Sequence, residues 1–234
     1  MHIPLSKRLQ VCAGFVSPGD RVADIGCDHG YLGIHLLTQG IAKSVIAADV
    51  NEGPLQSAIR NAEKYGVREK MTFFLSDGVR SIPRDFDTLV CAGMGADTMV
   101  SILEAAPWLK SNQYRLILQC QSKNPMLRCY LSDSGWRITE ESVLRDGRFL
   151  YTVMEVYYQP DYPRLSLGEC WFPPALLENP GPETVEYFRR LYDGLALAVA
   201  HGETGEKAQA LAFMDALADT PELTWLKEDL HDNG

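Results

Sequence analysis

The sequence has no uninterrupted apolar run of about 18 residues, the length that a membrane-spanning helix requires. It contains only five histidines, and its six cysteines form no CxxC pair that would suggest a metal site. Residues 1–8 lack the apolar core of a signal peptide. We therefore expect no membrane span and no metal, and we expect reduced thiols in a cytoplasmic protein.

Positive charge is scarce in one part of the chain. Residues 1–160 hold 17 basic and 17 acidic side chains, whereas residues 161–234 hold 5 basic and 14 acidic ones. The whole net charge of −9 therefore lies in the last third of the sequence. Because phosphate contacts need lysine and arginine, this last third does not by itself indicate a nucleic-acid-binding segment.

Short apolar segments alternate with helical patterns over the first two thirds of the chain. The expected strands are 21–25, 44–48, 71–75, 88–91 and 115–119. The expected helices are 5–16, 31–39, 54–65, 97–106 and 126–132. Such alternation predicts an α/β fold with a parallel sheet and right-handed crossovers.

The pattern changes after this unit. Residues 136–144 and 149–158 read as two long strands around Asp146-Gly147, a dipeptide typical of hairpin turns. An antiparallel hairpin then completes a mostly parallel sheet of seven strands.

The last third reads as a linker at 160–174 followed by two helices, at 183–199 and 206–217. The first helix carries an apolar seam with spacings of three and four. Its members are Val185, Phe188, Tyr192, Leu195 and Val199. We expect an α-helical hairpin, and we divide the chain into a domain at 1–160 and an appendage at 161–234.

A glycine-bearing loop joins the first strand to the following helix. Glycine accepts positive φ and lets a ligand approach the backbone, and the free N–H groups of the helix then face that ligand. The motif is Asp24-x-Gly26-x-x-x-Gly30, with Asp28 where nicotinamide-binding loops have their second glycine. A carboxylate there repels phosphates and suits a cation, such as the sulfonium and ammonium of S-adenosylmethionine.

Acidic residues end the next two strands at the same edge of the sheet. Asp49, followed by Val50, is placed either to accept hydrogen bonds from ribose hydroxyls or to cap a helix. Asp77-Gly78 is placed either to meet an adenine amino group or to form a plain turn.

Gly93-Met94-Gly95 ends the fourth strand at the topological switch point, where open sheets bind ligands. The two glycines leave room for a planar base or a cofactor, and Met94 can pack on a ring face. A glycine-rich turn is the alternative interpretation. His29 and Tyr31 share a loop with Asp28, beside the expected methyl position, so we consider all three as substrate-side candidates.

Several segments together resemble one family. They are residues 5–9, 24–32, 49–55, 93–95 and 145–151. The combination resembles the bacterial tRNA (adenine(22)-N1)-methyltransferases over about residues 3–158, and more loosely from 174 to 192. The chain departs from that pattern at Gln119-Cys120-Gln121, where Gln-Pro-Asn is usual.

The resemblance implies a class I methyltransferase domain, with a Rossmann-like sheet and a C-terminal helical hairpin. It implies methylation of adenine N1 in the D-arm of tRNA, with S-adenosylmethionine as cofactor and a flipped-out adenosine as target. The candidate cofactor-binding residues are Arg8, Asp24, Gly26, Gly30, Asp49, Val50, Asp77, Gly78 and Gly93. The candidate catalytic residues are Asp28, His29, Tyr31 and Met94, and the base-binding candidates are Tyr31, Met94 and Gly95.

Two other functions stay open from the sequence. A small-molecule methyltransferase on the same fold would suit the acidic tail, and a non-catalytic cofactor-binding partner protein would use the helical hairpin for association. Basic residues of the first domain are expected to contact RNA, although each can equally belong to a solvated surface. They include Arg60, Lys64, Arg68, Arg80 and Arg84.

Overall fold

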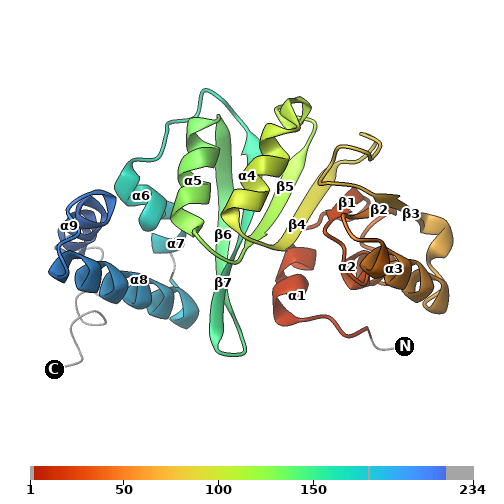
Figure 1. The fold of residues 1–234 in the computed structure, drawn as a ribbon, viewed down its shortest axis with the longest axis horizontal. Coiled ribbons are helices and arrows are strands. Elements are labelled where there is room, and N and C mark those ends of the chain that lie inside the picture. Colours follow the sequence, from red (N-terminus) through yellow and green to blue (C-terminus); the bar gives the residue numbers. More distant parts are fainter. Residues whose placement is uncertain (1–2, 179, 220–234) are drawn as a thin grey trace.

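The computed structural model describes residues 3–178 and 180–219 and contains one twisted sheet with helices on both faces (Figure 1). Its strands are β1 (Arg21–Ile25), β2 (Ser44–Asp49), β3 (Met71–Leu75), β4 (Thr88–Met94), β5 (Arg115–Cys120), β6 (Trp136–Asp146) and β7 (Phe149–Tyr158). Their spatial order is β3-β2-β1-β4-β5-β7-β6. The first five are parallel, and β7 is antiparallel to both β5 and β6, so the predicted fold class is confirmed.

The helices follow the predicted order. They are α1 (Lys7–Gly14), α2 (Tyr31–Thr38), α3 (Glu52–Lys64), α4 (Ala96–Glu104), α5 (Asn124–Asp133), α6 (Leu167–Trp171), α7 (Pro174–Leu177), α8 (Pro182–Ala200) and α9 (Glu206–Ala218), with short 3₁₀ turns at Arg68–Lys70 and Pro107–Leu109. Within the described residues, no helix is long and apolar enough to cross a membrane.

The two faces of the sheet bury separate cores. Alternate side chains of a strand point to opposite faces, so Val22 of β1 packs with the cluster under α1, α2 and α3, whereas Ala23 packs with the cluster under α4 and α5. This three-layer arrangement leaves the carboxyl ends of β1, β2 and β4 free at one edge. Open parallel sheets bind ligands at that edge.

We expected residues 160–174 to form an irregular linker, but the structure has a short helix, α6, within them. Ser166 begins α6 with a capping box, in which its side chain accepts from the Glu169 N–H while the Glu169 carboxylate accepts from the Ser166 N–H. The Ser-x-x-Glu spacing carries this signal, so the prediction of an irregular linker was wrong here.

The C-terminal helices form a third core of their own. Phe188 and Leu195 of the predicted seam are buried there, and Tyr192 packs against the cluster, together with residues of α9. Val185 and Val199 are only half-buried and do not belong to that cluster, so the seam is shorter than predicted. The division of the chain at residue 160 stays a prediction.

A buried ion pair joins the sheet to these helices. The Arg128 guanidinium on α5 donates to both oxygens of Glu141 on β6, at 3.1 and 2.7 Å, and both side chains are fully buried. It also donates to the Cys170 carbonyl and the Tyr187 hydroxyl. Removing one partner of such a group leaves an uncompensated buried charge, so α6 and α8 are tied to the sheet at this point.

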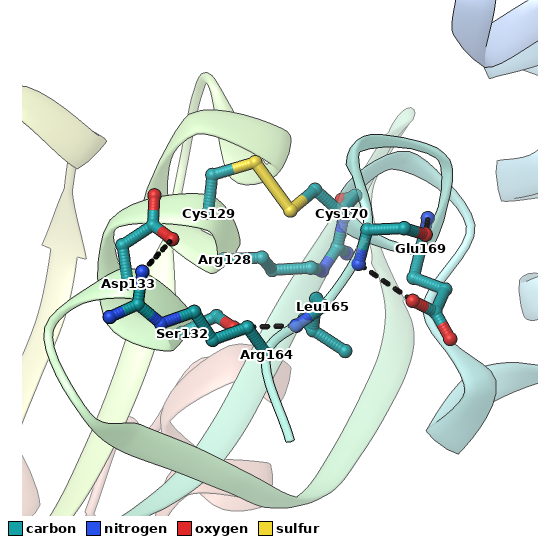
Figure 2. The surroundings of a disulfide bond; sticks show 9 residues. Arg128, Cys129, Ser132, Asp133, Arg164, Leu165, Glu169 and Cys170 are labelled. Carbon is teal, nitrogen blue, oxygen red and sulfur yellow. Dashed lines mark hydrogen bonds and ion pairs between the residues drawn. A yellow bond between two sulfur atoms is a disulfide. The ribbon is translucent and has the colours of Figure 1, made fainter. Parts of the chain in front are cut away.

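Cys129 of α5 and Cys170 of α6 form a disulfide, with Cα atoms 5.5 Å apart (Figure 2). The expectation of reduced thiols was therefore wrong for this pair, whereas Cys12, Cys27, Cys91 and Cys120 are free and buried. The two cysteines lie 41 residues apart in the sequence, so no short Cys-x-x-Cys spacing indicates that they pair.

Cys129→Ser should lower the free energy of unfolding by about 2–4 kcal/mol without reductant, because the bond closes a long loop in the unfolded chain. Urea unfolding with and without a dithiol reductant measures this effect. The parent should lose stability when reduced, whereas Cys129→Ser should not respond. Cys91→Ser, at a buried free thiol, is the matched control and should respond to reductant as the parent does. A parent with the same unfolding midpoint in both conditions would contradict the prediction.

Candidate active site

The loop between β1 and α2 follows a tight left-handed path. Gly26, Asp28 and Gly30 have φ angles of 72°, 50° and 72°, a region that glycine adopts freely and that aspartate tolerates better than most residues. The Gly26 N–H donates to the Ala48 carbonyl at 2.8 Å. A Cβ atom on Gly30 would lie 2.9 Å from the Cβ of Ala58, so the approach of α3 requires glycine at this position.

A cavity of about 260 Å³ lies beside this loop, at the carboxyl ends of β1 and β4. Its lining consists of Arg8, Leu9, Asp24, Gly26, Cys27, Asp28, His29, Tyr31, Leu32, Ala92 and Gly93. The structure therefore brings together seven of the fourteen candidate residues that the sequence predicted, and α1 contributes one of them, Arg8. Two carboxylates and one guanidinium line the cavity, so its charged groups favour a cationic ligand.

Asp24 is the most unusual group in the cavity. Its side chain is buried, and its Oδ2 atom has no hydrogen-bond partner. Burial raises the pKa of this carboxyl to about 7, the Gly33 N–H opposes that shift, and the charge of Asp49 adds to it. A buried polar atom without a partner is rare in native proteins, and Asp24 also lines the cavity, so this carboxyl is the first candidate for contact with a ligand there.

Asp49 braces the loop. Its Oδ2 accepts from the Asp28 N–H at 3.0 Å and its Oδ1 from the Asn51 N–H at 2.9 Å. Each carboxylate oxygen can accept a further hydrogen bond, so these contacts are compatible with ribose binding. Val50, the next residue, is 63% exposed at the end of β2. Neither residue lines the cavity, and their cofactor roles stay predictions.

A buried glutamine, which the sequence analysis did not select, connects Arg8 to the β4 loop. The Gln119 Oε1 atom accepts from Arg8 Nη1 at 3.1 Å and from the Gly93 N–H at 3.0 Å, and the side chain is fully buried. Gln119 therefore fixes α1 against the cavity. The sequence feature that could have identified it is a glutamine directly after the apolar run Leu116-Ile117-Leu118, at the end of a predicted strand.

Asp28, His29 and Tyr31 form the open rim of the cavity. The Asp28 carboxylate is 69% exposed and lies 3.6 Å from His29 Nε2, and the rings of His29 and Tyr31 are 6.0 Å apart. Asp28 and His29 are exposed, where a large substrate can reach them, whereas Tyr31 is half-buried and packs against the core below.

Of the Gly93-Met94-Gly95 segment, only Gly93 lines the cavity, and the roles of Met94 and Gly95 stay predictions. Gly93 has a φ of 81°, and a Cβ atom added there would lie 2.6 Å from Arg8 Nη1. The terminal methyl of Met94 covers Gly26, where an added Cβ atom would collide with it. Gly95 begins α4 in an extended conformation. Both contacts involve the flexible ends of side chains, so the positive φ angles of 72° at Gly26 and 81° at Gly93 are the stronger reason for glycine at these positions.

Asp77 and Gly78 lie apart from this cavity. Asp77 is exposed and pairs with Arg80 at 2.9 Å, beside a separate cavity of about 80 Å³. A Cβ atom on Gly78 would lie 2.9 Å from Ile102, so this glycine is required for packing against α4. The structure does not bring these residues to the predicted site, and their contact with an adenine stays a prediction.

A family model described as a methyltransferase domain matches residues 5–154. The chain belongs to this family. The resemblance predicted from the sequence is also confirmed, because the relatives of this methyltransferase include enzymes that modify tRNA.

The tRNA (adenine(22)-N(1))-methyltransferase of Bacillus subtilis is 33% identical over 154 residues, which are 65% of each protein. The crystal structure of the B. subtilis m1A22 tRNA methyltransferase has a TM-score of 0.78 at 27% identity, covering 98% of this chain and all of that one. A Streptococcus pneumoniae protein proposed to be a tRNA (m1A22) methyltransferase, solved with S-adenosyl-L-methionine, has a TM-score of 0.79 at 32% identity, covering 97% and 100%.

Asp24 should make the stability of this methyltransferase depend on pH. Its carboxyl has a higher pKa in the folded chain than the ordinary 3.8, so the folded chain holds more protons between about pH 4 and pH 7. Its contribution to stability is therefore complete below pH 4 and is lost as the pH rises through 7. In this window the loss is on the order of 1 kcal/mol per pH unit.

Asp24→Asn cannot ionise, so its stability relative to the parent should rise from pH 5 to pH 8 and then level off. Urea unfolding of both proteins at a series of pH values measures this difference, in which the titration of all other groups cancels. A difference that stays constant across the series would show that the Asp24 carboxyl does not titrate near 7.

Proposed function

We propose that this methyltransferase transfers the methyl group of S-adenosylmethionine to N1 of an adenosine in tRNA, with adenosine 22 of the D-arm as its target. The observation that carries the proposal is the carboxylate-lined cavity at the end of β1, in a chain that matches tRNA m1A22 methyltransferases over almost its whole length. A cytoplasmic location accompanies this proposal, since the substrate is bacterial tRNA.

The residues present fit this cofactor. The unpartnered Oδ2 atom of Asp24 is an acceptor for an ammonium group, and the carboxylates of Asp24 and Asp28 would oppose a pyrophosphate but not a sulfonium. Arg8, which lines the cavity, would pair with the cofactor carboxylate, and Asp49 would accept hydrogen bonds from ribose hydroxyls. Gly26 and Gly93 keep their parts of the cavity wall free of Cβ atoms. When bound, S-adenosylmethionine supplies a methyl group that a sulfonium activates for direct displacement.

The protein's own contribution to the chemistry is mainly positional. Adenine N1 carries its own lone pair, so no general base is needed, and holding the base in line with the methyl group is the principal task. N1 is paired inside a stem, so the nucleotide must leave the helix before it can react. Tyr31, Met94 and Gly95 are the surfaces on which the extruded base can lie, with His29 at the rim.

Asp28 is the candidate for electrostatic stabilisation. Methylation at N1 makes the adenine cationic, and a carboxylate aimed at the growing charge lowers the barrier. Asp28 is exposed at the rim, where a bound nucleotide would cover it and reduce the dielectric around it. Asp24 is buried and therefore less accessible to a substrate, so we assign this role to Asp28.

The direct test is transfer of labelled methyl groups to an unmodified tRNA transcript, followed by mass spectrometry of its nucleosides. We expect one N1-methyladenosine per transcript, and none in a transcript in which adenosine 22 is replaced by guanosine. Cofactor binding without any transfer would favour the non-catalytic partner protein. Methylation of small molecules in place of tRNA would favour a small-molecule methyltransferase on the same fold.

Asp28→Asn should reduce the single-turnover rate by about 100-fold, because it removes the charge while preserving shape. Asparagine tolerates the left-handed φ at this position, so the loop should keep its path. The measurement uses saturating cofactor, and calorimetry checks that its binding survives. A rate within threefold of the parent would show that Asp28 only supports the loop.

A further inference from the structure

The tip of the β6–β7 hairpin projects past the edge of the sheet that holds the cavity. β5 ends at Cys120, which pairs with Met94 on one side and with Thr152 on the other. Beyond that level β6 and β7 continue as a two-stranded ribbon, residues 144–151, which we name the finger. Figure 1 shows it extending beyond the other strands, with α1 to one side and α8 to the other.

The finger is held rigidly at its base. Leu144 and Tyr151 pack in the same core as Cys12 and Val16 around α1, the helix that carries Arg8 to the cavity. Leu150 faces the opposite way and packs against the core of α8. The position of the finger relative to the cavity is therefore fixed by packing on both of its faces.

The tip combines an exposed aromatic ring with arginines. Phe149 is 51% exposed, and the Arg148 guanidinium lies 4.9 Å from the centre of its ring. Arg190 of α8 donates to the Arg148 carbonyl, and Arg145 and Arg190 share the carboxylate of Glu186. Arg145, Arg148 and Arg190 therefore gather here with only Glu186 and the turn residue Asp146 as acidic partners on the tip and its α8 contact, in a chain whose net charge is −9.

The basic residues that the sequence suggested for RNA contacts are largely engaged elsewhere. Arg68 donates to the Met71 carbonyl, Arg80 pairs with Asp77, and Arg84 stacks on the ring of Trp108 at 4.6 Å. None of the three lies on the finger, which projects from the same edge of the sheet as the cavity and packs at its base on α1, the helix that carries Arg8. The finger is therefore better placed to meet a substrate that enters this cavity.

We propose that the finger is an RNA-docking element, in which Phe149 stacks on an unpaired base and Arg148 contacts a phosphate. Aromatic rings beside arginines are the usual means of holding single-stranded nucleotides, because every base offers a π face. This inference rests on the proposed tRNA substrate and adds the part of the enzyme that holds the nucleotides next to the extruded adenosine. Arg145 and Arg190 support the tip and its charge.

Phe149→Ala and Arg148→Ala test the proposal, with binding and single-turnover methylation of unmodified tRNA as readouts. We expect each change to weaken tRNA binding about tenfold, with little change in rate at saturating tRNA and in cofactor affinity. Arg148→Ala should also make the slope of log affinity against log salt less steep by about 0.7–0.9, the effect of one lost phosphate contact. Phe149→Ala should leave this slope unchanged, and Phe149→Trp should restore affinity, since indole also stacks.

Arg164→Ala is the matched control. Arg164 is also exposed and pairs with Asp133, at the end of α5 that lies opposite the cavity edge, so its loss should not affect tRNA binding. Parent-like tRNA affinity in both finger variants would overturn the finger proposal and leave the proposed function intact. A parent that neither binds nor methylates tRNA would overturn both.

Discussion

The carboxylate of Asp24 is buried near the end of β1, and its Oδ2 atom has no hydrogen-bond partner. Burial of a charge without a partner is costly, so this group must either hold its proton or meet a cation. The surrounding structure is consistent with the second outcome in the liganded state. Asp49 braces the loop beside the cavity, and Gln119 holds Arg8, which also lines it and could bind a carboxylate. A zwitterionic ligand matches a cavity that is lined by charged groups of both signs.

The strand register places a second feature, the projecting hairpin, at the same edge of the sheet. Met94, Cys120 and Thr152 are aligned across β4, β5 and β7, and the hairpin extends beyond that line to form the finger. Helix α1 contacts both the cavity and the base of the finger, while the buried pair of Arg128 and Glu141 and the neighbouring disulfide attach the C-terminal helices behind it. Cofactor binding and substrate docking can thus be separate tasks on one rigid frame.

The strands and turns of the sheet could be predicted because each one depends on residues that are close together in the sequence. Alternating strands, the turns at Gly26, Gly95 and Asp146-Gly147, and the carboxyl-end placement of Asp24 and Asp28 all depend on nearby residues. The features that it missed depend on contacts between distant segments. The Cys129–Cys170 bond, the Gln119–Arg8 contact and the Arg128–Glu141 pair join residues between 13 and 111 positions apart, and no spacing rule reveals them. Asp77 was placed at the correct edge, but its side chain turns to Arg80 instead.

The central claim is that Asp24 recognises the cationic part of S-adenosylmethionine. Calorimetric titration of the parent and of Asp24→Asn with this cofactor, from pH 5.5 to pH 8.5, tests it most directly. The titration of the ligand cancels in the ratio of the two affinities. Since the Asp24 pKa lies at about 7 in the free protein, the advantage of the parent over the variant should grow as the pH rises through that value. An affinity ratio that stays near one at every pH would contradict the account.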